Sequence, residues 1–361
     1  MPVLAVFLGL AGGAIVIVIS NAASGRGFDL LLPLRAYASM LTGAVTGVDE
    51  LVRTMSEATP LILAGLSVAV GFKAGLFNIG ANGQFLMGAL GAGAVGAAVA
   101  GWTPWLAIPI ALAGGMFFGA LYGFIPGALK AWTGAHEVVT TIMLNFIAAA
   151  LVAFLVTGPL LAPGFSFART GDVGNAAFPA IGNVAASGHI GILVAFAAVP
   201  IIYWLLNRSV LGFEIRMVGA NPSAARYAGI NPGRLVILTM SLAGMLAGMA
   251  GAGQVLGITH FVSASFSTAA GFDAITIALL GRVHPVGVLF AALLFGVMRA
   301  GSALMQIQVR VPVEIIDVIQ AVILLFLTAE ILVRWIFRVR VERAGLEELK
   351  TITKTYGQAT R

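Results

Sequence analysis

Residues 105–128 read WLAIPIALAGGMFFGALYGFIPGA, a run of 24 residues without a charged side chain. A helix of about 20 apolar residues crosses the hydrocarbon core of a bilayer, so this run is long enough to span a membrane. Glycine recurs along one face of the predicted helix, at Gly115, Gly119, Gly123 and Gly127. Gly244 and Gly248 repeat the four-residue spacing. Small residues let helix backbones approach closely in lipid, and we favour this packing role over a glycine-lined pore.

The composition of the whole chain agrees with this segment. The 361 residues are 60% hydrophobic and 9% charged, with a mean hydropathy of +1.02, whereas soluble domains carry about 25% charged residues. Comparable apolar runs are found along the chain, at 2–20, 59–75, 84–101, 105–128, 138–157, 190–206, 235–256, 271–282, 286–302 and 314–337. We therefore predict an all-α integral membrane protein with about ten transmembrane or partly spanning helices.

The first apolar run and the two short runs near the end of the chain each allow an alternative interpretation. The first run has no Lys or Arg before it, which favours an uncleaved first helix over a secretory signal. The runs at 271–282 and 286–302 are short and are joined by Arg282-Val283-His284-Pro285. The sequence leaves open whether this pair spans fully or forms a re-entrant hairpin.

The basic residues indicate an orientation. With both termini in the cytoplasm, fourteen of the twenty Lys and Arg residues lie on the cytoplasmic side, in agreement with the positive-inside rule. The segments 21–58 and 158–189 then lie outside. We expect one polytopic membrane domain over 1–337 and a charged cytoplasmic tail over 338–361.

Several kinds of chemistry are disfavoured or excluded. The net charge of +6 is accounted for by cytoplasmic loops and lipid headgroups, and no basic stripe with interleaved aromatics predicts nucleic-acid binding. There is no cysteine, and no pair of histidines has metal-ligand spacing, so we expect no metal site. No lysine follows a glycine, so the chain has no phosphate-binding loop and any ATP would bind to a partner subunit.

The polar stretch GLFNIGANGQ at 75–84 interrupts the apolar sequence between two predicted spans. Unwound backbone at membrane depth is tolerated where it is buried in protein or lines a cavity. Broken helices also present free backbone groups to a polar solute. An ordinary cytoplasmic turn with capping amides explains the residue types equally well.

The segment 207–234 is the longest polar stretch between two spans. Asn221-Pro222-Ser223 forms a turn that can cap a short helix over Ala224–Ala228, which Gly229 ends. A short helix with arginines on either side suits a docking site for a cytoplasmic partner. The alternative is a plain basic loop that satisfies the positive-inside rule.

Three motifs in these regions resemble a known family. Ala224-Ala225-x-x-x-Gly229 is similar to the loop by which permease subunits of ABC importers contact their ATPases. The stretches FNIGAxGQ at 77–84 and EVxTTxMLN at 137–145 resemble the branched-chain-type permeases, and within them the nucleoside or purine permeases. Two positions depart from that pattern, since Ser223 and Asn82 stand where the family and the subgroup have Glu.

The resemblance implies the permease subunit of an ATP-driven importer in the bacterial plasma membrane, which moves a small polar solute, in the first place a nucleoside, by alternating access. It also implies four partners: ABC ATPase subunits, a second permease subunit (homologous or identical), an extracytoplasmic solute-binding lipoprotein and membrane lipid. The residues expected along the solute pathway are Asn78, Asn82, Gln84, Thr140, Asn145 and Gln254. Those expected to couple to the ATPases are Glu214, Arg216, Ala224, Ala225, Arg226 and Gly229.

Other functions remain open at this point. A sugar or branched-chain amino acid permease would share the same motifs. An ion-coupled secondary transporter is a second alternative, because the segments 60–84 and 237–257 share a loose pattern that could reflect an internal repeat. An intramembrane enzyme is the weakest alternative, because the sequence offers no paired catalytic residues. We expect no catalytic residue and no cofactor in this chain.

Overall fold

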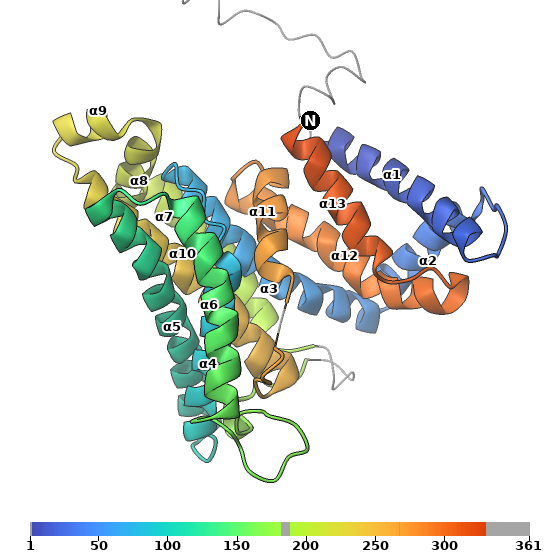
Figure 1. Cartoon of the computed structure of the whole chain (residues 1–361), viewed down its shortest axis with the longest axis horizontal. Coiled ribbons are helices and arrows are strands. Elements are labelled where there is room, and N and C mark those ends of the chain that lie inside the picture. The colour runs from blue at the N-terminus through green and yellow to red at the C-terminus, as the bar shows by residue number, and fades with distance from the viewer. Residues whose placement is uncertain (1, 182–187, 267, 330–361) are drawn as a thin grey trace, which may run out of the picture.

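The computed structural model describes residues 2–181, 188–266 and 268–329, and these residues form a helical protein (Figure 1). Isolated β-bridges join Arg169 to Ser263 and Ala180 to His189. In chain order the α-helices are α1 (Pro2–Ala23), α2 (Leu32–Val45), α3 (Val48–Lys73), α4 (Ala81–Ala98), α5 (Pro104–Thr133), α6 (Glu137–Thr157), α7 (Gly191–Arg208), α8 (Val210–Ala220), α9 (Pro222–Tyr227), α10 (Pro232–Gln254), α11 (Ala270–Leu280), α12 (Pro285–Val309) and α13 (Ile315–Thr328). A 3-10 turn, η1 (Gly174–Ala176), precedes α7, and a π-helical turn, η2 (Val255–Thr259), extends α10.

Seven of the described helices are long and apolar enough to cross a membrane, namely α1, α3, α5, α6, α7, α10 with η2, and α12. The other three predicted spans correspond to α4, α11 and α13. Helix α11 has 11 residues, or about 16 Å at a rise of 1.5 Å per residue, which is about half the thickness of a hydrocarbon core. The described part of the last predicted span is α13, and the remainder of 314–337, together with the tail 338–361, lies outside the described residues.

The helical hairpin of α11 and α12 differs in part from the expectation. Helix α12 has 25 residues and continues to Val309, so the prediction that the span at 286–302 is short was wrong. Of the two helices, only α11 is too short to cross by itself. The residues that join them, Arg282 and Val283, have positive φ angles of 54° and 55°. This left-handed backbone makes the connection tight.

The predicted start of the second span at residue 59 was wrong, and no helix was expected in the preceding outer segment, 21–58. It contains α2 and the first part of α3, which begins at Val48 instead of at residue 59. Asp49 and Glu50 lie in the first turn of α3, where the helix dipole favours acidic side chains. Apolarity alone therefore placed the start of this helix about three turns too late.

Figure 1 shows two groups of helices on either side of α3. Helices α4, α5, α6 and α10 lie on one side, and α1, α2, α12 and α13 lie on the other. The central position of α3 explains its burial, because residues 58–71 of this helix are almost all inaccessible. An apolar cluster that includes α3, α7, α10, α11 and α12 joins the two groups.

Glycines form the seam between α5 and α10, as the sequence predicted. A Cβ atom at Gly119 would overlap the carbonyl oxygen of Gly244, and a Cβ at Gly248 would lie 2.5 Å from the carbonyl oxygen of Gly115. Backbone therefore touches backbone along this seam, which only glycine permits. The packing interpretation of the glycine stripe is confirmed.

The segment 207–234 contains two helices where one was expected. The predicted helix at Ala224–Ala228 is α9, displaced by two residues because Pro222 takes the first helical position, where its missing N–H costs nothing. Helix α8 precedes it and was not predicted. The two helices lie at one end of the molecule, beside the carboxyl end of α5 (Figure 1).

Candidate functional site

The turn between α3 and α4 carries the first group of predicted solute-pathway residues. Asn78 and Gln84 form a reciprocal amide pair, in which Asn78 Nδ2 donates to Gln84 Oε1 at 2.9 Å and Gln84 Nε2 donates to Asn78 Oδ1 at 3.3 Å. Asn78 Oδ1 also accepts from the backbone N–H of Gly80 at 3.1 Å. Both side chains are only 1% exposed. They therefore hold the turn against the start of α4.

Asn145 on α6 fixes the same turn from a second side. Its Oδ1 accepts from the N–H of Gly83 at 2.8 Å, and its Nδ2 donates to the carbonyl of Ile79 at 3.0 Å. At the start of α6, the buried carboxylate of Glu137 accepts a hydrogen bond from Lys130 Nζ of α5 at 2.5 Å. The turn, α4 and α6 thus meet at one polar cluster, which we call the amide cluster and define as Asn78, Gln84 and Asn145.

The remaining predicted pathway residues lie apart from the amide cluster or take no part in it. Asn82 is buried where the start of α11 crosses α4, and its Oδ1 has no hydrogen-bond partner among the described residues. Thr140 donates to the backbone carbonyl of Glu137 in its own helix, at 3.0 Å. Gln254 is half-buried at the end of α10. The structure brings three of the six predicted residues together.

The residues predicted to couple to ATPases lie on α8 and α9. Asn221 Oδ1 caps α9 by accepting from Ser223 N at 3.0 Å and from Ala224 N at 3.1 Å. Gly229, with φ of +81°, ends the turn in a left-handed conformation that favours glycine. Within α9, Ala225 is fully buried, whereas Ala224 and Arg226 are exposed. Glu214 and Arg216 are half-buried on α8.

A short helix with an exposed face is a suitable docking element. Tyr227 at the end of α9 is 95% exposed, although tyrosine is a large and partly apolar side chain. Interfaces are enriched in such tyrosines. The geometry of α9 therefore fits a contact with another protein.

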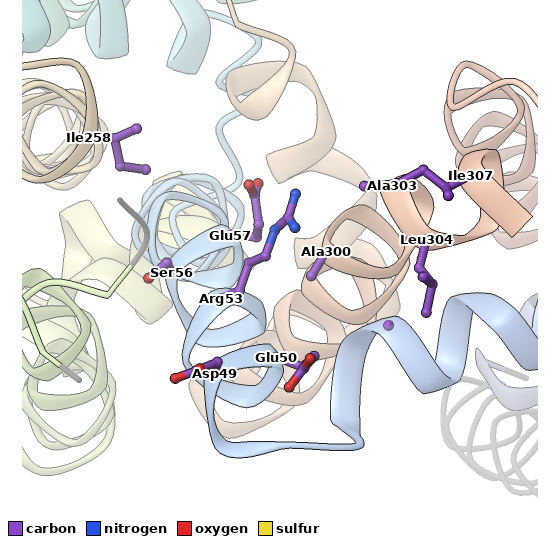
Figure 2. A pocket seen from close by; sticks show the side chains of 11 residues that line it. Asp49, Glu50, Arg53, Ser56, Glu57, Ile258, Ala300, Ala303, Leu304 and Ile307 are labelled. Carbon is purple, nitrogen blue, oxygen red and sulfur yellow. The ribbon is translucent and has the colours of Figure 1, made fainter. Parts of the chain in front are cut away.

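A cavity of about 510 Å³ opens at the other end of α3 (Figure 2). Its polar wall comes from the first turns of α3 and contains Asp49, Glu50, Arg53, Ser56 and Glu57. Its apolar wall comes mainly from α12 and includes Ala300, Ala303, Leu304 and Ile307, with Ile258 of η2 nearby. In Figure 2 the side chains of Arg53 and Glu57 lie next to each other. A volume of this size is in the range of small-molecule sites.

This cavity was not predicted from the sequence, because the second span was expected to begin at residue 59, after the residues that form the polar wall. One signal was available, since Asp49, Arg53 and Glu57 recur at every fourth position and so share one helix face. Gln254, which was predicted, precedes Ile258 by one turn and lies on the same continuous helix as this part of the lining.

Comparison with known proteins identifies the family. Residues 50–328 match the family described as the permease component of branched-chain amino acid transport systems, and the chain belongs to that family. It is a multi-pass membrane protein and a transport subunit. No solved structure matches the chain.

Individual relatives match nearly the whole chain. The guanosine ABC transporter permease protein NupP of Bacillus subtilis is 35% identical over 93% of this chain and 94% of its own length. The nucleoside ABC transporter permease protein NupB of Lactococcus lactis is 35% identical over 99% of this chain and 97% of its own. The glucose ABC transporter permease protein TsgB13 of Haloferax volcanii is 34% identical over 95% and 91%, respectively.

Proposed function

We propose that this chain is the membrane permease subunit of an ATP-driven importer of nucleosides. The observation that carries the proposal is the match to the guanosine and nucleoside permeases over more than 90% of both chains. ATP hydrolysis takes place on partner ATPase subunits, and an extracytoplasmic binding protein delivers the solute. A second permease subunit, related or identical, completes the pathway across the plasma membrane.

In this proposal the α8–α9 region receives the movement of the ATPases. It has an exposed helix, α9, with a capped start and a glycine at its end. Both α8 and α9 lie on the side to which the positive-inside rule assigns the cytoplasm. Nucleotide-driven closure of the ATPase pair displaces α9, and the membrane helices reorganise to open the pathway inward.

The cavity beside α3 provides a binding site for the solute at the outer end of the pathway. Carboxylates such as Glu57 accept hydrogen bonds from ribose hydroxyls, and the apolar wall of α12 offers a surface for the base. The site lies at the end of α3 that is remote from α9, as a site for a solute arriving from outside requires. Its lining is compatible with neutral, hydroxyl-rich solutes.

A sugar is the second candidate substrate, because a glucose permease shares 34% identity over most of the chain. Sugar hydroxyls would use the same carboxylates, whereas a base would also need the apolar wall. The discriminating experiment measures uptake of labelled guanosine by cells that express the full transporter, with unlabelled uridine, glucose or leucine as competitors. Competition by uridine alone supports the nucleoside proposal, and competition by glucose alone contradicts it in favour of a sugar importer.

A further inference from the structure

The backbone of α8 lies directly against the turn that follows α3. A Cβ at Gly219 near the end of α8 would lie 2.9 Å from the carbonyl carbon of Ala74 and 3.0 Å from the nitrogen of Gly75, and it would overlap the carbonyl oxygen of Lys73. A Cβ at Gly75 would in turn lie 3.3 Å from the oxygen of Gly219. Gly75 also has a φ of +71°, which favours glycine. No side chain separates the two segments.

The same contact reaches α9 through an apolar cluster. Ala74 and Leu76 of the turn pack with Ile215 and Val218 of α8 and with Ala225, the one buried side chain of α9. All five side chains are at most 5% exposed. Close-packed groups of this kind transmit displacement, because no void is available to absorb it. A movement of α9 must therefore move the turn.

On its far side, the turn is tied to α4 and α6 by the amide cluster. Asn78 and Gln84 bond each other, and Asn145 bonds the backbone at Ile79 and Gly83. Breaking these bonds without water would leave buried polar groups unsatisfied, which is unfavourable. The turn is thus held to α4 and α6 as firmly as it is packed on α8.

We propose that the Gly75–Gly219 contact and the amide cluster form one rigid relay, which carries the displacement of α8 and α9 into α4 and α6. This inference rests on the proposed function, since it requires that α9 meets an ATPase. It assigns Asn78, Gln84 and Asn145 a positioning role in place of direct contact with the solute. Their polar atoms are engaged within the protein, and the cavity lined by charged groups lies at the opposite end of α3.

The test compares Gly219→Ala with wild type in purified transporter reconstituted with its ATPases and binding protein. The matched control is Gly233→Ala in the first turn of α10, where a Cβ meets nothing closer than 3.5 Å. Four quantities are measured: assembled complex, ATP hydrolysis, maximal uptake rate and KM for the solute. The relay predicts that Gly219→Ala assembles and hydrolyses ATP, while the solute moved per ATP falls at least tenfold and KM stays within about twofold.

Gln84→Met tests the amide cluster in the same assay and keeps the inference testable should Gly219→Ala fail to assemble. The relay predicts the same loss of solute moved per ATP at unchanged KM. A raised KM with an unchanged maximal rate would show instead that Gln84 contacts the solute, and an unchanged transport ratio in both variants would also overturn the relay. A smaller amount of complex with normal transport per complex would reduce both sites to a purely structural role, against the proposal.

Uptake measurements on the wild-type transporter distinguish a failure of the relay from a failure of the proposed function. If wild type carries glucose and not nucleosides, the substrate proposal fails, and the relay is measured as glucose moved per ATP. If wild-type uptake needs no ATP, the importer proposal fails and the relay fails with it. If wild type couples normally and both variants do too, only the relay is overturned.

Discussion

Single amide side chains decide the geometry of the turn between α3 and α4. Asn145 reaches across 62 residues of sequence to the backbone of Gly83 and across 66 to Ile79. One side chain thereby satisfies a buried donor and a buried acceptor that the turn leaves open. The local backbone of the turn therefore depends on this distant residue as well as on its own sequence.

Asn145→Ala therefore destabilises the protein. It leaves the N–H of Gly83 and the carbonyl of Ile79 without their partner, which costs about 2–6 kcal/mol in total. We expect the thermal unfolding midpoint in detergent to fall by several degrees. Thr140→Ala on the same helix is the control, because Thr140 bonds only its own helix backbone. Equal midpoints for the two variants would contradict this account of the amide cluster.

A buried histidine on the loop before α7 gives the protein a pH dependence. His189 is 1% exposed, stacks on Phe178 with ring centroids 5.9 Å apart, and has no hydrogen-bond partner for either ring nitrogen among the described residues. Burial, together with a smaller contribution from repulsion by His260, lowers the pKa of His189 from 6.5 to about 4. The unfolded chain therefore binds this proton more readily than the folded protein does.

This difference in pKa sets the direction in which the stability of the folded protein changes with pH. The contribution of neutral His189 to stability is complete above pH 6.5 and decreases as the pH falls from 6.5 towards 4. We expect a lower thermal midpoint at pH 5.0 than at pH 7.5, and a smaller difference in His189→Phe, which keeps the stacking on Phe178. An equally large difference in the variant would assign the pH dependence to other groups.

At the scale of helices, the structure is a set of close backbone contacts. The α5–α10 seam, the crossing of Asn82 by Gly271 and the contact of α12 with α2 at Gly301 all exclude a Cβ atom. Each contact brings two helices together without an intervening side chain, as small residues do in lipid. Helix α3 lies between the two groups of helices (Figure 1), with the cavity at one of its ends and α9 near the other.

Gly119→Val tests the seam. Its side chain would overlap the backbone of Gly244 and Gly248, so α5 and α10 cannot approach as they do in the folded protein. We expect almost no monodisperse protein on size-exclusion chromatography. Gly101→Val is the control, because a Cβ at that position meets nothing within 4 Å. Normal yield of Gly119→Val would show that the seam tolerates a larger separation.

The exposed end of α9 makes a second prediction at this scale. Tyr227→Ala removes a side chain that is 95% exposed and supports no described packing, so folding and membrane insertion should be unchanged. We expect at least a fivefold loss of co-purifying ATPase subunit. Trp105→Ala, at an exposed aromatic residue (91%) on the first turn of α5, is the control. Full retention of the ATPase in Tyr227→Ala would remove this tyrosine from the docking surface.

For the molecule as a whole, composition and spacing predicted what depends on local sequence. The helical membrane class follows from the apolar runs, and the seam follows from glycines at every fourth position. The first turns of α3 were missed because charged residues such as Asp49 and Glu57 interrupt the apolar run by which a span is recognised. These residues line a cavity. The contact of Asn145 with the turn was missed for another reason, since Asn145 and Gly83 are distant in sequence and their contact arises from the fold.

The central claim is that this chain carries nucleosides inward at the expense of ATP on a partner. The most direct measurement is accumulation of labelled guanosine in proteoliposomes that contain the full transporter and its binding protein, with and without ATP and with an ionophore present. We predict accumulation that requires ATP and is insensitive to the ionophore. Accumulation that proceeds without ATP and collapses with the ionophore would contradict the account and identify an ion-coupled transporter.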